Sequence, residues 1–413
     1  MSFTRPKKAI GLDIGVHAVK AVQMSRSSGR LLVEQARQIL VDRNMVNNDP
    51  VTAQAVAVRE CLRTMAPAQS LIVAALAGQT VVVRYPRMAN VGQEQLAQAV
   101  NREAAHNIPY DLNDVFLDWT ILEESTENEQ KQLKVLLVAA KHEAIDSRMQ
   151  VMQNAEIQCG ILGVDSLALA DAAEACDFLR VGETVAIVNI GLGSASAHFI
   201  KDGISNFIRE VNWGSREMIQ AIAKDRRCSY EEAVSQLENF IQIPVDSQVV
   251  PEAEEADLPV ADELPEASPV VGGGSLLDPL DDEIMHTPAA QKKDLGGYSN
   301  PFVQQQAPTR PLSEVLAAPL ARMAMEFRRS FDFYEHQLYE QPVNRIILCG
   351  GVARMQLISE TLHEELGIDD IEVASPENSA LFLGAEDDVD DLLQQGPQYM
   401  VAIGLAARGM ADL

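Results

Sequence analysis

Near its beginning the chain carries a carboxylate, a glycine and a lysine at a spacing that suits phosphate chemistry. An apolar run leads into Asp13, Gly15 follows two residues later, and a β-branched alternation that includes Lys20 resumes after it. This pattern predicts a β-hairpin whose tight turn carries one carboxylate. Gly15 lets backbone N–H groups approach a ligand, and Lys20 adds a positive charge. We interpret the stretch as a phosphate-binding hairpin in which Asp13 faces a magnesium ion, although alone it also fits an ordinary hairpin with an acidic turn.

A stretch in the middle of the chain repeats this design. An apolar run leads into Asn189, one apolar residue follows, and Gly191, Gly193 and Ser194 make a small turn before the next apolar run. Two hairpins of one design predict two lobes with related folds. Each lobe would present a glycine turn to the same ligand.

Two adjacent glycines, Gly350 and Gly351, end an apolar strand in the C-terminal part of the chain. A strand that ends in this way before a helix lets the backbone pass close to a planar or phosphorylated ligand. Each of the three motifs is weak by itself, but three in this order are much more specific. Because paired phosphate hairpins and an aspartate suit a metal-bound polyphosphate, the sequence predicts a magnesium nucleotide as the shared ligand.

Composition and charge narrow the class of protein. The chain has 413 residues, of which 47% are hydrophobic and 23% charged, as is ordinary for a soluble globular protein of two or more domains. A net charge of −27 argues against non-specific binding to nucleic acid or to an anionic membrane surface. Five scattered cysteines without a CxxC pair argue against a disulfide framework or a zinc site and favour a reducing compartment.

The sequence also lacks a signal for membrane insertion. No apolar run reaches the roughly 18 residues that a membrane-spanning helix needs. The N-terminus is polar and basic but has no apolar core of the kind found in signal peptides. If the protein works at a membrane, we therefore expect another protein to bring it there.

Hydrophobic periodicity predicts the elements that position the three motifs. Short continuous or alternating apolar runs predict strands, longer runs with helical spacing predict helices, and together they indicate an α/β fold. Strands are expected within 9–40, 71–76, 80–86, 115–122, 134–140, 184–200, 344–353 and 371–374. Helices are expected over 51–65, 91–107, 143–154, 165–177, 216–226, 229–240, 313–339, 355–366 and 399–408.

The segment 244–311 differs in composition from the rest of the chain. It is rich in Asp, Glu, Pro, Gly and Ala and poor in aromatic residues. Such a segment cannot bury enough apolar surface to offset chain entropy, so we expect most of it to be disordered. It fits a solvated interaction tether, but a tolerated loop insertion in the second lobe is the simpler interpretation.

Four motifs together carry a family resemblance. The segments 10–15 with Lys20, 188–191, 347–351 and 402–406 are similar to the first phosphate, second phosphate, adenosine and closing-helix motifs of the actin, Hsp70 and sugar-kinase superfamily. The segments 83–88, 108–110 and 115–118 resemble the inserted subdomain of PilM, a family of bacterial type IV pilus assembly proteins related to the division protein FtsA. The resemblance covers about 9–243 and 312–410, and the acidic segment lies outside it.

The resemblance implies a two-lobed actin-like (ribonuclease-H-like) α/β fold with a small α+β subdomain inserted in the first lobe and a disordered acidic insert in the second. The implied divisions are 9–84 for the first lobe, 85–142 for the inserted subdomain, 143–180 for the interlobe helix region, 181–243 and 312–396 for the second lobe, 244–311 for the acidic insert and 397–413 for the closing helix.

The resemblance also implies ATP and Mg²⁺ as ligands. Asp13 and Asp165 are the implied magnesium residues, although Asp165 also fits a helix N-cap. The implied nucleotide-binding residues are Asp13, Gly15, Val16, His17, Lys20, Asn189, Gly191, Gly193, Ser194, Gly350 and Gly351.

In function, the resemblance implies a cytoplasmic scaffold of the type IV pilus inner-membrane platform, held peripherally at the inner face of the cytoplasmic membrane. It would be recruited by the N-terminal cytoplasmic tail of the membrane protein PilN, bound as an extended peptide beside the inserted subdomain 85–142. Pilus motor ATPases and further copies of the same chain are additional candidate partners. Neither nucleic acid nor direct membrane insertion is expected.

Departures from the family pattern bear on catalysis. Asn189 stands where the second phosphate motif usually has aspartate, and Val16 and His17 stand where the first turn usually carries serines. Family members also offer a Glu/Lys pair to ribose and adenine on the helix near 231–240, but here no lysine follows Glu231 and Glu232. Since an amide adds no charge to a metal shell, we expect at most weak ATP hydrolysis. A nucleotide-independent adaptor of the same fold, an FtsA-like division protein and a small-molecule kinase stay as alternatives, and for the kinase no carboxylate base is evident in the cleft.

Overall fold

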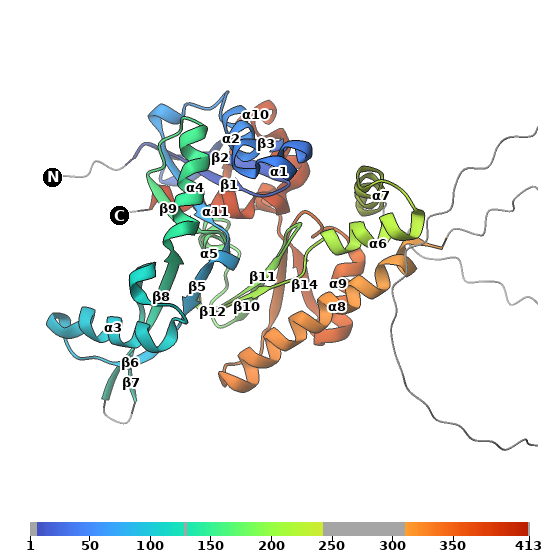
Figure 1. Cartoon of the computed structure of the whole chain (residues 1–413). Helices are drawn as coiled ribbons and strands as arrows, with labels where there is room; N and C mark the ends of the chain where they lie inside the picture. Colours follow the sequence, from blue (N-terminus) through green and yellow to red (C-terminus); the bar gives the residue numbers. More distant parts are fainter. Residues whose placement is uncertain (1–5, 128–129, 243–309, 412–413) are drawn as a thin grey trace, which may run out of the picture. The chain divides into compact units, whose positions relative to one another are not determined.

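The computed structural model describes residues 6–127, 130–242 and 310–411 (Figure 1). The segment 244–311, for which composition predicts disorder, lies outside the described residues except for its last two. All described residues belong to one compact unit of the chain. In that unit three β-sheets and their flanking helices make the α/β fold that periodicity predicts.

The first sheet has six strands in the order β15-β3-β2-β1-β4-β9. β1, β2 and β3 form an antiparallel meander, whereas β4 runs parallel to β1 and β9 parallel to β4. β1 and β4 are almost wholly buried, as expected for strands covered on both faces. The strands are β1 (Lys8–Ile14), β2 (Ala18–Ser27), β3 (Arg30–Leu40), β4 (Leu71–Leu76), β9 (Ile161–Val164) and β15 (Phe382–Leu383).

The second sheet repeats this topology in the order β12-β11-β10-β13-β14. β10, β11 and β12 form an antiparallel meander, and β13 and β14 continue the sheet in parallel. The β10–β11 hairpin therefore occupies the place of β1–β2, and the prediction of two related lobes is confirmed. The strands are β10 (Thr184–Ile190), β11 (Ala195–Lys201), β12 (Ile204–Val211), β13 (Arg345–Gly350) and β14 (Asp370–Val373).

A third, smaller sheet is inserted after β4. β5 (Val81–Arg84), β6 (Arg87–Ala89) and β7 (Val115–Glu127) each pair antiparallel with β8 (Gln130–Lys141). Helix α3 (Gln93–Asn107) packs Val100 and Ala104 against Val135 and Leu137 of β8. We call residues 81–141 the inserted subdomain, and its helix-plus-strands composition is as the sequence predicts.

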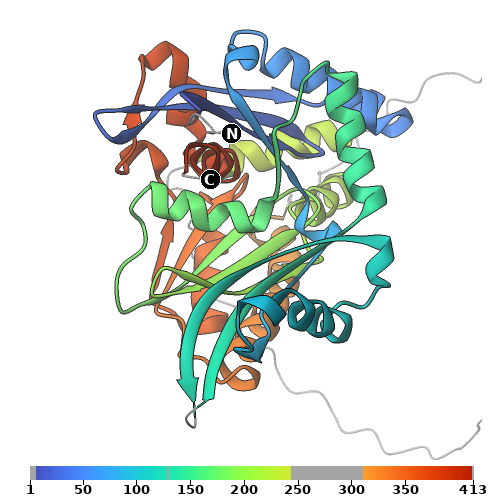
Figure 2. The ribbon, with the colours of Figure 1, turned by 90° about the vertical axis from the view of Figure 1, so that its left-hand side faces the viewer.

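Two helices lie between the two large sheets (Figure 2). α11 (Met400–Met410) contacts β1, β2 and β4 of the first lobe, and α5 (Asp165–Ala175) contacts α11 together with β10 and β11 of the second lobe. At their crossing, a Cβ on Gly404 would lie 1.8 Å from the carbonyl oxygen of Ala168. Only glycine permits this approach.

The remaining helices flank the two lobes. α7 begins with a capping box, in which Ser229 N donates to Glu232 Oε2 at 2.8 Å and Glu232 N donates to Ser229 Oγ at 3.2 Å. The helices are α1 (Arg43–Asn48), α2 (Pro50–Cys61), α4 (His142–Asn154) and α10 (Glu386–Gln395) in the first lobe, and α6 (Arg216–Arg226), α7 (Tyr230–Gln242), α8 (Leu312–Asp332) and α9 (Gln356–Leu366) in the second.

Several elements differ from the sequence prediction, since β6, β9, β12, β15, α1 and α10 lie outside the expected ranges. The single helix expected over 313–339 ends at Asp332, and a π-helical turn, Phe333–Gln337, follows it. α10 is absent from the prediction because its acidic residues hide a buried face that consists only of Val389 and Leu392. Acidic residues in its first turn suit the positive end of the helix dipole.

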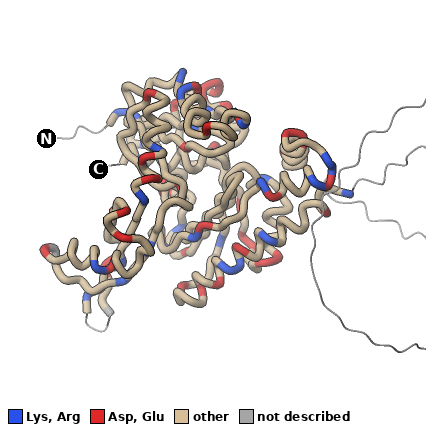
Figure 3. The backbone as a smooth tube through the Cα atoms, viewed as in Figure 1, with Lys and Arg blue, Asp and Glu red and all other residues tan. Residues whose placement is uncertain are grey.

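Charge is spread over the described part of the chain, with acidic and basic residues interspersed (Figure 3). Of the helices in the ranges given above, none is long and apolar enough to cross a membrane. All five cysteines are free thiols.

Candidate functional site

The β1–β2 hairpin brings Asp13 and Lys20 together. The two residues are register partners, and Lys20 Nζ lies 3.4 Å from Asp13 Oδ2. A hydrogen bond of 3.1 Å from Gly15 N to the carbonyl oxygen of Ala18 closes the turn. The first predicted motif is therefore a tight turn beside a half-buried ion pair.

The β10–β11 hairpin has the same backbone without the charges. A hydrogen bond of 2.9 Å from Gly191 N to the carbonyl oxygen of Ser194 closes its turn. Asn189 occupies the position of Asp13, and its register partner is Ser196, where the first hairpin has Lys20. The repeat that the sequence shows is thus a repeat of backbone geometry.

The third motif lies beside the second. β13 pairs with β10 in parallel, which sets Gly350 next to Ile190. Gly350 has a φ of +98°, and a Cβ there would lie 2.2 Å from the carbonyl oxygen of Ile190, so the position requires glycine. Gly351 has open space around its Cα, since an added Cβ would meet no atom within 4 Å.

Asp165 lies at the start of α5 and close to the first hairpin. Its Oδ1 accepts hydrogen bonds from Gly78 N at 2.7 Å and from Ser166 N at 2.6 Å. Burial, followed by the negative charge of Asp13, raises the pKa of Asp165 to about 6. The N-cap position of α5 falls on Val164, so the alternative interpretation of Asp165 as the N-cap is wrong.

Sequence reasoning missed Arg148, a cation beside these carboxylates. Its Nη2 donates to the carbonyl oxygen of Ile14 at 3.3 Å, and its Nη1 is buried without a hydrogen-bond partner in the described part of the chain. Burial lowers the pKa of Arg148, while the charges of Asp13 and Asp165 oppose that effect. Arginine inside an amphipathic helix carries no sequence signal for such a role.

Sequence reasoning also missed Glu210, a carboxyl of β12 that lies beside Gly78. Register places Asn189, Ser196 and Glu210 in one row across β10, β11 and β12. Glu210 Oε1 is buried without a hydrogen-bond partner among the residues described, and a Cβ on Gly78 would lie 2.0 Å from it. Burial and then the charge of Asp165 raise the pKa of Glu210 to about 8.

α7 of the second lobe reaches toward the first lobe. Arg43 Nη1 lies 2.8 Å from Glu231 Oε1, and the Arg43 guanidinium lies 3.4 Å from the centre of the Tyr230 ring. Partial desolvation and then Lys20 lower the pKa of His17, whereas Glu238 of α7 acts in the opposite direction. The exposed turn at His17 therefore lies within electrostatic range of Glu238 of α7.

Comparison with known proteins identifies the family. The family model for the type IV pilus assembly protein PilM matches residues 11–248 and 302–410 of this chain. The chain belongs to the PilM family. The solved PilM-PilN type IV pilus biogenesis complex aligns with a TM-score of 0.71 at 19% identity, covering 99% of this chain and 100% of that chain. This confirms the two-lobed actin-like fold that the sequence resemblance implies.

Two further solved structures align with this chain at lower similarity. The ethanolamine utilization protein EutJ from Carboxydothermus hydrogenoformans has a TM-score of 0.47 at 12% identity, covering 98% of this chain and 90% of that chain. MreB 5 of Spiroplasma citri bound to AMPPNP has a TM-score of 0.43 at 12% identity, covering 97% of this chain and 95% of that chain.

Proposed function

We propose that this protein is an ATP-binding scaffold of the type IV pilus inner-membrane platform. The observation that carries the proposal is the pair of hairpin turns with one geometry, Gly15–Ala18 in the first lobe and Gly191–Ser194 in the second, with Gly350 beside the second. Membership of the PilM family supports the role in pilus assembly. The nucleotide would lie between the two turns.

The residues present fit a magnesium nucleotide. Lys20 and the unsatisfied Nη1 of Arg148 are donors suited to phosphate oxygens. Asp13 and Asp165 offer the carboxylate oxygens that magnesium prefers, and a bound ion would neutralise charge on the phosphates. Open space at Gly351 suits close passage of the adenosine part.

A scaffold fits these residues better than an efficient ATPase. Asn189 brings no charge to the second turn, and Lys20 neutralises part of the charge of Asp13. Glu210, with a pKa of about 8, is largely protonated at neutral pH and is therefore a poor general base. Magnesium and the hairpin turns would hold and orient the nucleotide, while water would lack a residue that activates it.

For the partner, we propose the N-terminal cytoplasmic tail of a PilN-type membrane protein, which would hold this chain at the inner face of the cytoplasmic membrane. The related solved structure is a complex of PilM with PilN. In the inserted subdomain, β7 pairs with β8 alone among the described strands, and its Phe116 and Ile121 are exposed. Such an edge suits an extended peptide, which adds backbone hydrogen bonds to a sheet.

Calorimetric titration of the full chain with Mg-ATP tests the nucleotide part of this proposal. We expect binding of one nucleotide per chain with a sub-millimolar dissociation constant. No heat of binding at millimolar Mg-ATP would contradict it and favour the nucleotide-independent adaptor of the same fold.

Fluorescence anisotropy with a labelled synthetic peptide of the PilN tail tests the partner. We expect saturable binding to the full chain and none for a peptide of the same composition in scrambled order. A tail that fails to bind, with and without Mg-ATP, would contradict the recruitment part alone.

A further inference from the structure

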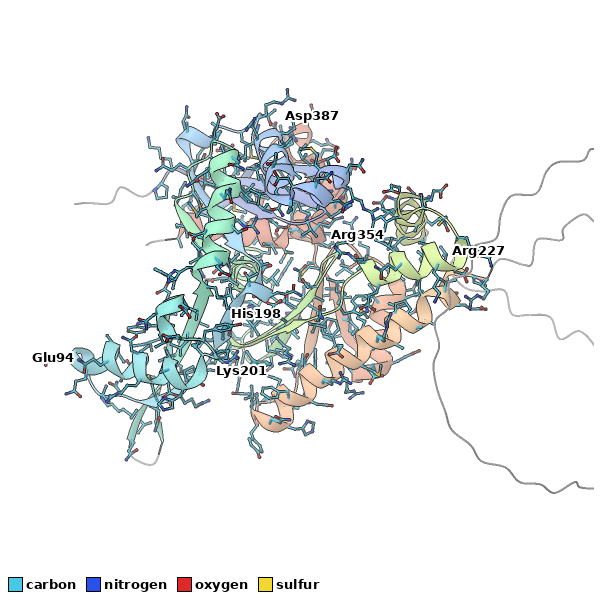
Figure 4. The ribbon with its side chains drawn as sticks, in the orientation of Figure 1. Glu94, His198, Lys201, Arg227, Arg354 and Asp387 are labelled. Atoms are coloured by element: carbon cyan, nitrogen blue, oxygen red, sulfur yellow. The ribbon has the colours of Figure 1, made fainter. Side chains whose placement is uncertain are left out.

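A continuous chain of hydrogen bonds leads from the candidate nucleotide site to the inserted subdomain. It begins at Ser166, the neighbour of Asp165, and passes through His198 of β11 and Ser205 of β12 to Tyr85 (Figure 4 labels His198). His198 Nδ1 lies 2.9 Å from the carbonyl oxygen of Ser166, and His198 Nε2 lies 2.8 Å from Ser205 Oγ. Ser205 Oγ lies 2.7 Å from the Tyr85 hydroxyl.

The chemistry of the groups fixes the direction of every bond in this chain. A carbonyl oxygen only accepts, so His198 Nδ1 carries the proton that is donated to Ser166. His198 is fully buried, and burial lowers its pKa to about 4, so the ring is neutral near pH 7 and its Nε2 accepts from Ser205. The single hydroxyl proton of Ser205 is then used, and Ser205 Oγ accepts from Tyr85.

The two ends of this series of hydrogen bonds lie in the candidate nucleotide site and in the inserted subdomain. At one end, the Ser166 N–H donates to Asp165 Oδ1 at 2.6 Å, and the carbonyl oxygen of the same residue accepts from His198, so Ser166 links the two side chains. At the other end, Tyr85 lies in the short link between β5 and β6 of the inserted subdomain. The chain therefore joins a candidate magnesium residue to the frame of the subdomain.

An ionic contact supports the same junction. Glu340 of the second lobe lies 3.2 Å from Lys201 Nζ and 4.0 Å from Arg87 Nη2 of the inserted subdomain. Lys201 is on β11, the strand that also carries His198 (both are labelled in Figure 4). The β11–β12 hairpin thus contacts Tyr85 of the β5–β6 link directly through Ser205, and Glu340 bridges Lys201 of β11 to Arg87 at the start of β6.

We propose that His198 is a positioning residue that couples the nucleotide site to the inserted subdomain, because it transmits a shift of Ser166 through Ser205 to Tyr85. The proposal rests on the proposed function, since it requires Mg-ATP between the hairpins. Coupling of this kind is reciprocal, so an extended peptide that moves Tyr85 changes the affinity for Mg-ATP by the same factor.

Hydrogen exchange of the full chain, measured by mass spectrometry with and without Mg-ATP, tests the coupling. In the wild type, we expect Mg-ATP to slow exchange in both hairpin turns and also in residues 84–89. The slowing in 84–89 is expected to be about fivefold, the low end of typical coupling. Tyr85→Phe keeps the slowing in the hairpins and loses it in 84–89. Tyr334→Phe is the matched control. The Tyr334 hydroxyl accepts from Asn206 at 2.7 Å, next to the series of hydrogen bonds from Ser166 to Tyr85 but outside it, so this variant is expected to keep both effects.

The outcomes distinguish a failure of the coupling from a failure of nucleotide binding. Slower exchange in both hairpins with none in 84–89 overturns the coupling and leaves nucleotide binding intact. Equal loss in Tyr85→Phe and Tyr334→Phe also overturns it, since a general loosening of the region would then explain the result. No slowing in either hairpin overturns the proposed function and the coupling with it.

A spectroscopic measurement tests the geometry independently of ATP. Nitrogen-15 NMR of the histidine side chains in the full chain is expected to show His198 as the neutral tautomer protonated at Nδ1, changed little between pH 8 and pH 6. A ring protonated at Nε2 alone, or at both nitrogens at pH 7, would overturn the donor and acceptor roles assigned from Ser166 to Tyr85 and with them the role of His198.

Discussion

The two hairpins of the candidate site have one backbone and two kinds of chemistry. In the first lobe the turn at Gly15 lies beside the ion pair of Asp13 and Lys20, whereas the matching turn in the second lobe lies beside Asn189 and Ser196. The acidic group of the second lobe lies two strands away, at Glu210. The comparison teaches that the two hairpins share one backbone, while the charged side chains beside the turns are concentrated in the first lobe. Metal binding at the proposed site would depend on those charges.

Disturbing the backbone beside the second hairpin, at Gly350, has the largest expected effect. Gly350→Ala adds a Cβ 2.2 Å from the carbonyl oxygen of Ile190 at a φ of +98°, and we expect it to lower the free energy of unfolding by about 3 kcal/mol. Gly351→Ala is the control, because its Cβ would meet no atom within 4 Å, and it is expected to stay near the wild type. Urea unfolding measures both, and equal losses would show that Gly350 is not specially constrained.

Removing the charge of the first hairpin is expected to have the next largest effect. The ratio of ATP affinity in Mg²⁺ to ATP affinity in EDTA reports how much the metal contributes. Asp13→Asn lowers this ratio about tenfold, or roughly 1.4 kcal/mol, because a carboxylate oxygen near the metal is lost. Asn189→Ala leaves it unchanged, since that position is neutral in either form. A similar drop in both variants would refute the asymmetry between the lobes.

The raised pKa of Glu210, in the second lobe, predicts a pH-dependent effect on stability. With its pKa raised above the ordinary value in the folded protein, ionisation of Glu210 destabilises the fold as pH rises from about 4.5 toward 8. Glu210→Gln is therefore expected to be more stable than the wild type by roughly 1 kcal/mol at pH 8, and the gain shrinks toward pH 5. Thermal unfolding at the two pH values measures this, with the exposed Glu364→Gln as control. A gain that does not depend on pH would contradict the assignment.

Restoring a charge to the second hairpin has the smallest expected effect. Asn189→Asp places a carboxylate where Asp13 stands in the first lobe, which gives a bound metal a second charged ligand. We expect the turnover of ATP, measured as phosphate release, to rise only a few-fold, because Glu210 is still protonated near neutral pH. A loss of ATP binding in this variant would show that the site needs a neutral second turn.

The sequence predicts the hairpins well because their signals are local. Gly15 and Gly191 mark turns, and the apolar runs before them mark strands, so both motifs and the repeated topology follow from short windows.

The parts that the sequence does not predict depend on contacts between distant segments. Glu210 enters the site only through the register of three strands, and within its own strand it reads as an ordinary exposed acid. Arg148 comes from α4, which precedes α5 in the chain, and only burial distinguishes it from a surface arginine. The π-helical turn after Asp332 has no periodicity signal, because its residues continue the pattern of α8.

A structure of the full chain with AMPPNP and Mn²⁺, in which anomalous scattering locates the metal, tests the shared site most directly. We expect the phosphates between the turns at Gly15 and Gly191, with Asp13 and Asp165 as the carboxylates nearest to the metal. A nucleotide that contacts only one of the two turns, or a metal remote from both carboxylates, would contradict a single site built from two hairpins.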